Sequence, residues 1–140
     1  MAEVGIILPL LTLVTFSIVD FASIFYAYLS MQNGVAAATR FAVTGRQLSN
    51  PLNNATLSRS DSIKLAMRQA TPGVKINDSD FAFYNVTTGA SDTGGPEDII
   101  RVTVTHDWPL LTPVLRPFFT GGSVRLIVSS TMKNEPFPTS

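Results

Sequence analysis

The chain of 140 residues is long enough for one modest globular domain, and a second independent core is not expected. Its ten basic and ten acidic side chains cancel, and only 14% of residues are charged, so it lacks the positive field that binds nucleic acid. It has no cysteine, which excludes disulfides, thiolate metal sites and thiol nucleophiles.

The first predicted element is an apolar helix at the N-terminus. Val4–Val19 contains no charged residue, and the apolar pattern resumes after Asp20 as far as Leu29. A helix of roughly 20 residues crosses the hydrocarbon core of a bilayer, so this stretch predicts a membrane-spanning helix with some excess for tilt. It is too long for a typical signal-peptide core and no small-x-small cleavage site closes it, so cleavage after it is not expected.

The charge pattern around this helix bears on its N-terminus. No Lys or Arg precedes Arg40, so the usual positive signal for membrane orientation is missing from this stretch. Removal of a basic leader would explain that pattern, and we therefore expect Met1 to be a mature N-terminus.

Two acidic residues, Glu3 and Asp20, lie in or beside the apolar run. A charged side chain at the bilayer centre costs on the order of 2.5–3.5 kcal/mol, so each needs a partner or a polar location. For Glu3 the available partner is a free α-amino group, its own or a neighbouring subunit's, and the alternative is a place among the lipid headgroups. Asp20 has no visible partner nearby in the sequence, and we expect it to act as a cap or to be neutralised.

The apolar spacing continues beyond the predicted span. Apolar residues recur at helical intervals from Met31 to Ala42, and Gly45 supplies the usual C-terminal stop, so one helix of about 44 residues is predicted. Pro9 and Gly34 mark places where it can bend, and the small residues after Gly34 suit close helix packing. A helix that is apolar nearly all round must be buried by something other than its own small domain.

The rest of the chain predicts a small α+β domain. After a polar connection, Ser58 or Ser60 is expected to cap a short amphipathic helix that ends at Thr71. Strands rich in β-branched and aromatic residues are predicted at 80–87, 99–108 and 123–133. They indicate a three- to four-stranded antiparallel sheet with one covered face. We therefore predict a helical region at 1–45 and an α+β head at 46–140.

The connection Pro109–Phe119 is unusually apolar for a surface loop. It needs a cover, which the sheet edge, the membrane surface or an adjoining subunit could each provide. The side chains expected to make a contact with another subunit are Leu110, Leu111, Val114, Leu115, Phe118 and Phe119.

The sequence contains no motif that indicates catalysis or a metal site. The one histidine, His106, has no cysteine or second histidine to join it, so a structural role is expected. The acidic residues from Asp78 to Asp98 do not match an EF-hand spacing, although a loose calcium site in the polar loop Gly89–Glu97 stays open. We therefore predict a protein that is not an enzyme and has no cofactor.

Three Asn-x-Ser/Thr sequons are candidate glycosylation sites, and they begin at Asn54, Asn77 and Asn85. They are consistent with an exposed extracellular domain. Because Ser and Thr are common in this chain, chance explains most such matches, and glycosylation stays open.

Segments at both ends of the chain resemble the TadE-like family, the pilin-like proteins of tight-adherence secretion systems. The likeness includes EVGIILP, in which Glu3 stands six residues before Pro9, the tetrapeptide IVDF, and an alanine-rich run into Arg40. The C-terminal segment Met132–Phe137 is also similar to a family signature.

The resemblance implies a type IV pilin-like fold, export as a prepilin, removal of a basic leader by a prepilin peptidase, and assembly by inner-membrane machinery. Copies of the same chain would then form an extracellular filament for adhesion or surface attachment. The implied assembly residues are Met1, Glu3, Pro9, Asp20, Gly34 and Arg40. Glu3 departs from the family pattern, because pilins usually place this glutamate deeper from the mature end.

A carboxylate in such a bundle can set the register, because Glu3 of one subunit meets the amino terminus of the next at one depth only. A head-to-tail contact that does not close into a ring generates a helical filament. The leading hypothesis is therefore a structural pilin-like subunit. The alternatives are a membrane-anchored minor pseudopilin of a tight-adherence or type II-like secretion apparatus, and a single-pass anchored binding module.

Overall fold

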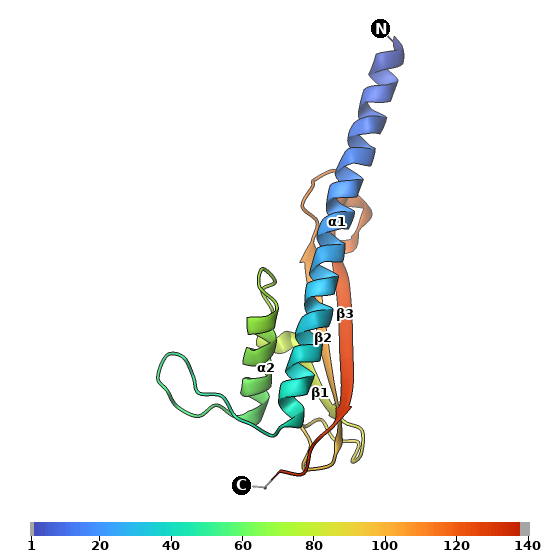
Figure 1. Ribbon diagram of the computed structural model, residues 1–140. Coiled ribbons are helices and arrows are strands. Elements are labelled where there is room, and N and C mark those ends of the chain that lie inside the picture. The colour runs from blue at the N-terminus through green and yellow to red at the C-terminus, as the bar shows by residue number, and fades with distance from the viewer. Residues whose placement is uncertain (1, 138–140) are drawn as a thin grey trace. The chain divides into compact units, whose positions relative to one another are not determined.

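The computed structural model describes the backbone of residues 2–137 and the side chains of residues 4–137. In this range the main elements are α1 (Ala2–Val43), α2 (Arg59–Ala70), β1 (Phe81–Asn85), β2 (Ile99–Pro109) and β3 (Ser123–Lys133) (Figure 1). Single 3₁₀ turns occupy the connections at η1 (Asp78–Asp80), η2 (Arg116–Phe118) and η3 (Thr120–Gly122). This layout of one long apolar helix, one short helix and an antiparallel sheet confirms the predicted α+β fold.

Contacts divide the described residues into two compact units. One comprises the chain up to Leu29 together with Asp107–Leu126, and the other comprises Ser30–His106 and the chain from Ile127 onward. We call them the anchor unit and the head unit. The sequence-based division at residue 45 distinguishes a helical region from a head by their expected functions, not by contacts within the chain. It stays a prediction.

α1 continues through Pro9 and ends next to the predicted glycine. Hydroxyls in its first half donate to carbonyls of the preceding turn, as Thr12 Oγ1 does to Leu8 O at 2.8 Å, so they are satisfied without water. Gly45 has a φ of +64°, and its N–H donates to Ala42 O at 3.2 Å. Glycine adopts this left-handed conformation without the strain that a Cβ would add, which explains why the helix ends there.

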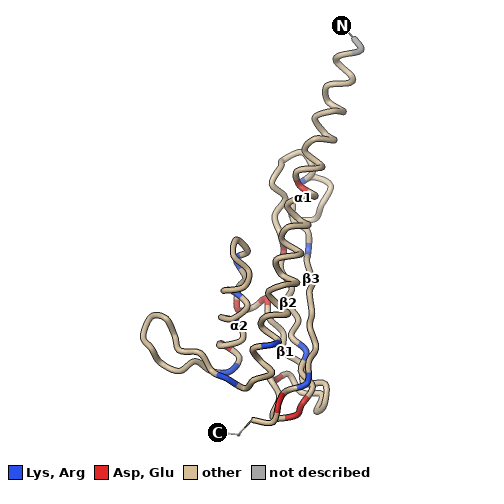
Figure 2. The backbone as a smooth tube through the Cα atoms, viewed as in Figure 1, with Lys and Arg blue, Asp and Glu red and all other residues tan. Residues whose placement is uncertain are grey.

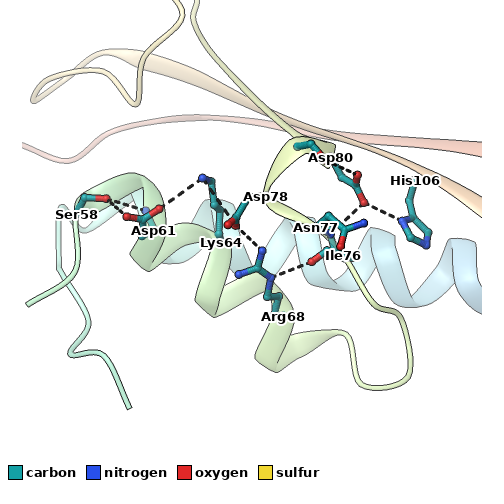
Figure 3. Close-up of polar contacts among 10 residues, drawn as sticks. Ser58, Asp61, Lys64, Arg68, Ile76, Asn77, Asp78, Asp80 and His106 are labelled. Atoms are coloured by element: carbon teal, nitrogen blue, oxygen red, sulfur yellow. Dashed lines mark hydrogen bonds and ion pairs between the residues drawn. The ribbon is translucent and has the colours of Figure 1, made fainter. Parts of the chain in front are cut away.

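The core of the head unit forms on the last turns of α1, on α2 and on the sheet. Figure 1 shows α2 beside the C-terminal part of α1. Gly34 of α1 lies against Met67 of α2 and against Thr71, which follows the last residue of α2. Ser58 caps α2 by accepting a hydrogen bond from the Asp61 N–H at 3.1 Å (Figure 3). The buried apolar side chains of the head unit include Met31, Val35, Ala38, Ala42, Ile63, Met67, Ile100, Val102, Val104 and Val128.

The sheet has the strand order β1-β2-β3. β1 pairs antiparallel with β2, and Phe83 lies opposite Val102 in the register. Ile100, Val102 and Val104 are all buried, at alternate positions of β2. This period of two confirms the covered face that the sequence predicts.

Candidate functional site

The first half of α1 presents apolar side chains to its surroundings on every side. Consecutive residues are exposed, and Ile6 and Ile18 reach 74% and 64%. No charged residue interrupts Val4–Val19, and the first part of α1 is correspondingly tan in Figure 2, without red or blue. α1 is long and apolar enough to cross a membrane, so the chain has a candidate membrane anchor.

Asp20, which ends this uncharged stretch, is only 1% exposed. One carboxylate oxygen accepts the N–H groups of Leu111 at 2.8 Å and Thr112 at 3.0 Å, and the other accepts the Thr112 hydroxyl. We call this arrangement the Asp20 clamp. Three donors on one buried carboxylate satisfy a group that would otherwise be costly to bury.

Further contacts within the anchor unit hold the loop after β2. The Trp108 indole N–H donates to Ser23 Oγ at 2.9 Å, one turn of α1 beyond Asp20. The Arg116 guanidinium donates twice to Leu110 O, at 3.1 Å each, while the Leu110 N–H donates to Gly122 O at 3.0 Å. The loop is therefore tied to α1 and to itself by polar groups, not by its apolar side chains alone.

The apolar side chains of this loop divide into two groups. Leu110 is buried and Val114 and Leu115 are half-buried, so part of the loop covers itself. Leu111, Phe118 and Phe119 are 57%, 74% and 43% exposed. The last three are the members of the predicted contact set that remain available to a membrane or to another molecule.

The predicted assembly residues differ in their surroundings. Pro9 is exposed on the apolar half of α1, and Arg40 is exposed on the head unit. Gly34 is buried against the α2 region, where a Cβ would lie 2.1 Å from Thr71 Cγ2, so its small size serves packing inside this chain. Met1 and the side chain of Glu3 lie outside the described residues, and contact of any of these residues with another subunit stays a prediction.

Acidic side chains in the head unit stabilise turns. Asp98 accepts the Gly95 N–H at 2.7 Å and the Asn85 amide at 2.9 Å, and these two donors, with the charge of Arg59, lower the pKa of Asp98. The Arg68 guanidinium, which bonds Asp78, similarly lowers the pKa of that carboxyl (Figure 3).

The contacts of the one histidine, His106, fit a structural role. His106 Nδ1 lies 2.8 Å from Asp80 Oδ2, and the same carboxylate oxygen accepts the Asn77 N–H at 3.1 Å (Figure 3). Among residues 4–137 no group of three or more His, Asp or Glu side chains is placed to hold a metal ion. In the polar loop, Asp92 accepts the Gly94 N–H at 2.8 Å, which is the geometry of a turn.

The three sequons have different accessibility. Asn54 and Asn77 are exposed, whereas Asn85 is 1% exposed. The Asn85 amide donates to Asp98 and its oxygen accepts the N–H groups of Thr87 and Thr88. The Asn85 side chain is therefore buried and hydrogen-bonded within the fold, and glycosylation of Asn54, Asn77 or Asn85 stays a prediction.

Sequence reasoning missed the partners of Asp20. The expectation that no partner exists near it holds along the chain, but Thr112 lies 92 positions away and bonds it in space. The sequence contains one indication of this pairing: Thr112 is the only polar residue in the apolar segment PLLTP, and Asp20 is a single acidic residue within an apolar helix.

Comparison with known proteins bears on the N-terminal region. Neither curated proteins nor solved structures give a significant match to the chain. A family model does match, over residues 1–40, and that family is described as TadE-like protein. The matched stretch contains the exposed apolar half of α1 and Asp20. Residues 1–40 are thus similar to the TadE-like family, which confirms the resemblance found at the N-terminal end of the sequence.

Proposed function

We propose that the chain is a structural pilin-like subunit that polymerises through α1 into an extracellular filament of the tight-adherence type, for adhesion or surface attachment. Before assembly it is anchored in the inner membrane by α1. Its partners are then copies of itself, the inner-membrane assembly machinery and a prepilin peptidase. This role is structural rather than enzymatic.

The observation that carries the proposal is the all-round exposure of apolar side chains on the first half of α1, which lies within the stretch that is similar to the TadE-like family. Each Val, Leu, Ile or Phe side chain gains about 1.5–3 kcal/mol when it moves from water into an apolar environment. The chain itself leaves this half of the helix uncovered, so lipid or other copies of α1 must supply the cover. A bundle of such helices along one axis supplies it without a membrane.

Glu3 has the register role in this proposal. Leu and Ile contacts between apolar helices are similar at many axial offsets, whereas a carboxylate and an amino terminus pair at one offset. Adhesion comes from the apolar surface, and the ion pair selects the step between subunits.

The alternative is a minor pseudopilin that stays in the membrane as part of a secretion apparatus. The same exposed half of α1 supports it, because lipid covers that surface as well as a bundle does. The two roles differ in where the mature chain accumulates.

The test is to shear surface material from cells that express the chain and to examine it by electron microscopy and amino-terminal sequencing. The proposal expects filaments built of this chain. Recovery solely in membrane fractions would overturn it in favour of the anchored pseudopilin. Glu3→Ala should lower the sheared yield while membrane insertion is kept, and Glu135→Ala, which removes an exposed glutamate of the head unit, should leave the yield unchanged.

A further inference from the structure

A second exposed apolar surface lies in the anchor unit, where the uncharged run of α1 ends. On α1 it consists of Phe21 and Phe25, which are 71% and 55% exposed. On the clamped loop it consists of Leu111, Phe118 and Phe119. We call these five side chains the collar, and they include no charged group.

The Asp20 clamp fixes the position of the collar along the helix. Because the Asp20 carboxylate bonds the N–H groups of Leu111 and Thr112, the loop backbone meets α1 at the level of Asp20. The Trp108–Ser23 hydrogen bond adds a second attachment one turn further along. The loop that carries Leu111, Phe118 and Phe119 is therefore attached to α1 at Trp108, Leu111 and Thr112.

The level of the clamp corresponds to one edge of a bilayer. Val4–Val19 is an uncharged helical run whose length, at about 1.5 Å per residue, is roughly 24 Å. The hydrocarbon core is about 30 Å thick, so this run occupies most of it. Asp20 and the loop bonded to it then lie near the boundary between acyl chains and headgroups.

The chemistry of the collar fits that boundary better than bulk water. Exposed Phe and Leu side chains are typical of segments that insert at the headgroup–acyl boundary, and the collar consists of Phe21, Phe25, Leu111, Phe118 and Phe119. Arg116, within the same loop, is the one charged residue of Pro109–Phe119 and is exposed. A guanidinium at this level suits lipid phosphates, while its donation to Leu110 O keeps it on the loop.

We propose that the collar is an interfacial membrane contact, in which the clamped loop inserts its apolar side chains at the headgroup–acyl boundary beside α1. The occupant of this surface is the phospholipid bilayer. The contact sets the depth of the helix and applies to the membrane stage, whether or not the chain later polymerises. Its continuity with the lipid-facing run of α1 distinguishes it from an isolated apolar patch.

Trp108 provides a direct test, because it is the only tryptophan in the chain and its indole lies next to Ser23 of α1. The full-length chain would be reconstituted in phosphatidylcholine–phosphatidylglycerol vesicles that contain lipids brominated either near the headgroup or near the end of the acyl chain. The expected result is that bromine near the headgroup quenches Trp108 fluorescence more strongly than bromine near the chain end.

Variants of the collar test whether its side chains insert into the bilayer or whether Trp108 only lies near it. Replacing Leu111 and Phe118 together by serine should lower quenching by shallow bromine and raise quenching by water-soluble acrylamide. Leu52→Ser is the matched control, since Leu52 is 94% exposed in the head unit and has no part in the collar. The control should behave as the unchanged chain, and circular dichroism of each variant reports whether the helix is kept.

Three outcomes would overturn the proposal. Equal acrylamide access with and without vesicles would place the collar in water. Stronger quenching by deep bromine would place the clamp inside the hydrocarbon core. Shielding of Trp108 that appears only at a high ratio of protein to lipid would make the collar a contact between copies of this chain.

Discussion

The two halves of α1 are both rich in apolar residues but have different surroundings. From Val4 to Val19 the side chains are exposed around the whole helix, whereas Met31, Val35, Ala38 and Ala42 are each at most 1% exposed within the head unit. The second half has smaller apolar side chains and includes Gln32, Asn33 and Arg40. The difference is whether this chain supplies the partner surface.

The contrast assigns separate roles to one continuous element. The second half stabilises the head, because its buried face repeats every three or four residues against a core. The first half has no buried face in this chain and is available to lipid or to other subunits. Substitutions in the second half should therefore affect head stability, and equivalent substitutions in the first half should affect anchoring or assembly.

The largest effect is expected from truncating a core side chain of the second half. Met31→Ala should destabilise the head by about 2–5 kcal/mol, since Met31 is completely buried and the change leaves a cavity. Hydrogen exchange of the β2 amides at Val102 and Val104 would measure the loss. Leu11→Ala, at a position 60% exposed, is the control and should leave this exchange unchanged. Equal loss in both variants would contradict the division of α1 into two roles.

Removal of the Asp20 carboxylate should release the loop of the anchor unit. Asp20→Ala leaves the Thr112 hydroxyl and the N–H groups of Leu111 and Thr112 without their acceptor. A buried unsatisfied donor costs about 1–3 kcal/mol, and opening of the loop avoids this cost because it exposes the donors to water. The expected results are faster hydrogen exchange at Leu111 and Thr112 and faster proteolysis of Pro109–Phe119.

Asp20→Asn tests whether this effect depends on hydrogen bonding or on charge. The asparagine oxygen can accept both N–H groups, and the Thr112 hydroxyl can turn to accept from the amide. This variant should keep most of the protection. If it releases the loop as fully as alanine does, the clamp depends on charge instead.

Adding a methyl group to the two glycines of α1 sharpens the comparison. Gly34→Ala should destabilise the head by about 1–3 kcal/mol, because the new Cβ would lie 2.1 Å from the buried Thr71 side chain. Gly5→Ala should cause no loss, because no atom lies within 4 Å of the Cβ position. Thermal unfolding followed by near-ultraviolet circular dichroism would compare them. A neutral Gly34→Ala would show that α2 can shift away at little cost.

The sequence predicts features that repeat locally. The length of α1 follows from its apolar run and Gly45, the cap of α2 from Ser58, and the face of β2 from the alternation of Ile100, Val102 and Val104. Each of these depends on neighbours in sequence, so a short window contains the necessary information.

Features that depend on distant pairing could not be predicted in the same way. Asp20 bonds Thr112, and Gly34 packs against Thr71. Neither contact can be read from a repeating pattern in the sequence. The sequence also does not show that Gly34 packs against Thr71 or that Asn85 bonds Asp98, and the predicted roles of Gly34 in assembly and of Asn85 in glycosylation stay predictions.

The smallest effect concerns the acid sensitivity of the head. The Gly95 N–H, the Asn85 amide and Arg59 lower the pKa of Asp98 in the folded chain, so its ionised form is stabilised by folding. That contribution is fully present above the unfolded pKa of about 3.9 and is lost as the pH falls through the lower folded pKa. Head stability should thus decline as the pH falls below about 4.

Asp98→Asn should flatten this decline, whereas Glu97→Gln, which removes a neighbouring charge without these hydrogen bonds, should preserve it. Urea unfolding of both variants at several pH values measures the slopes, and an unchanged slope in Asp98→Asn would assign the acid response to another carboxylate, with Asp78 beside Arg68 the next to test.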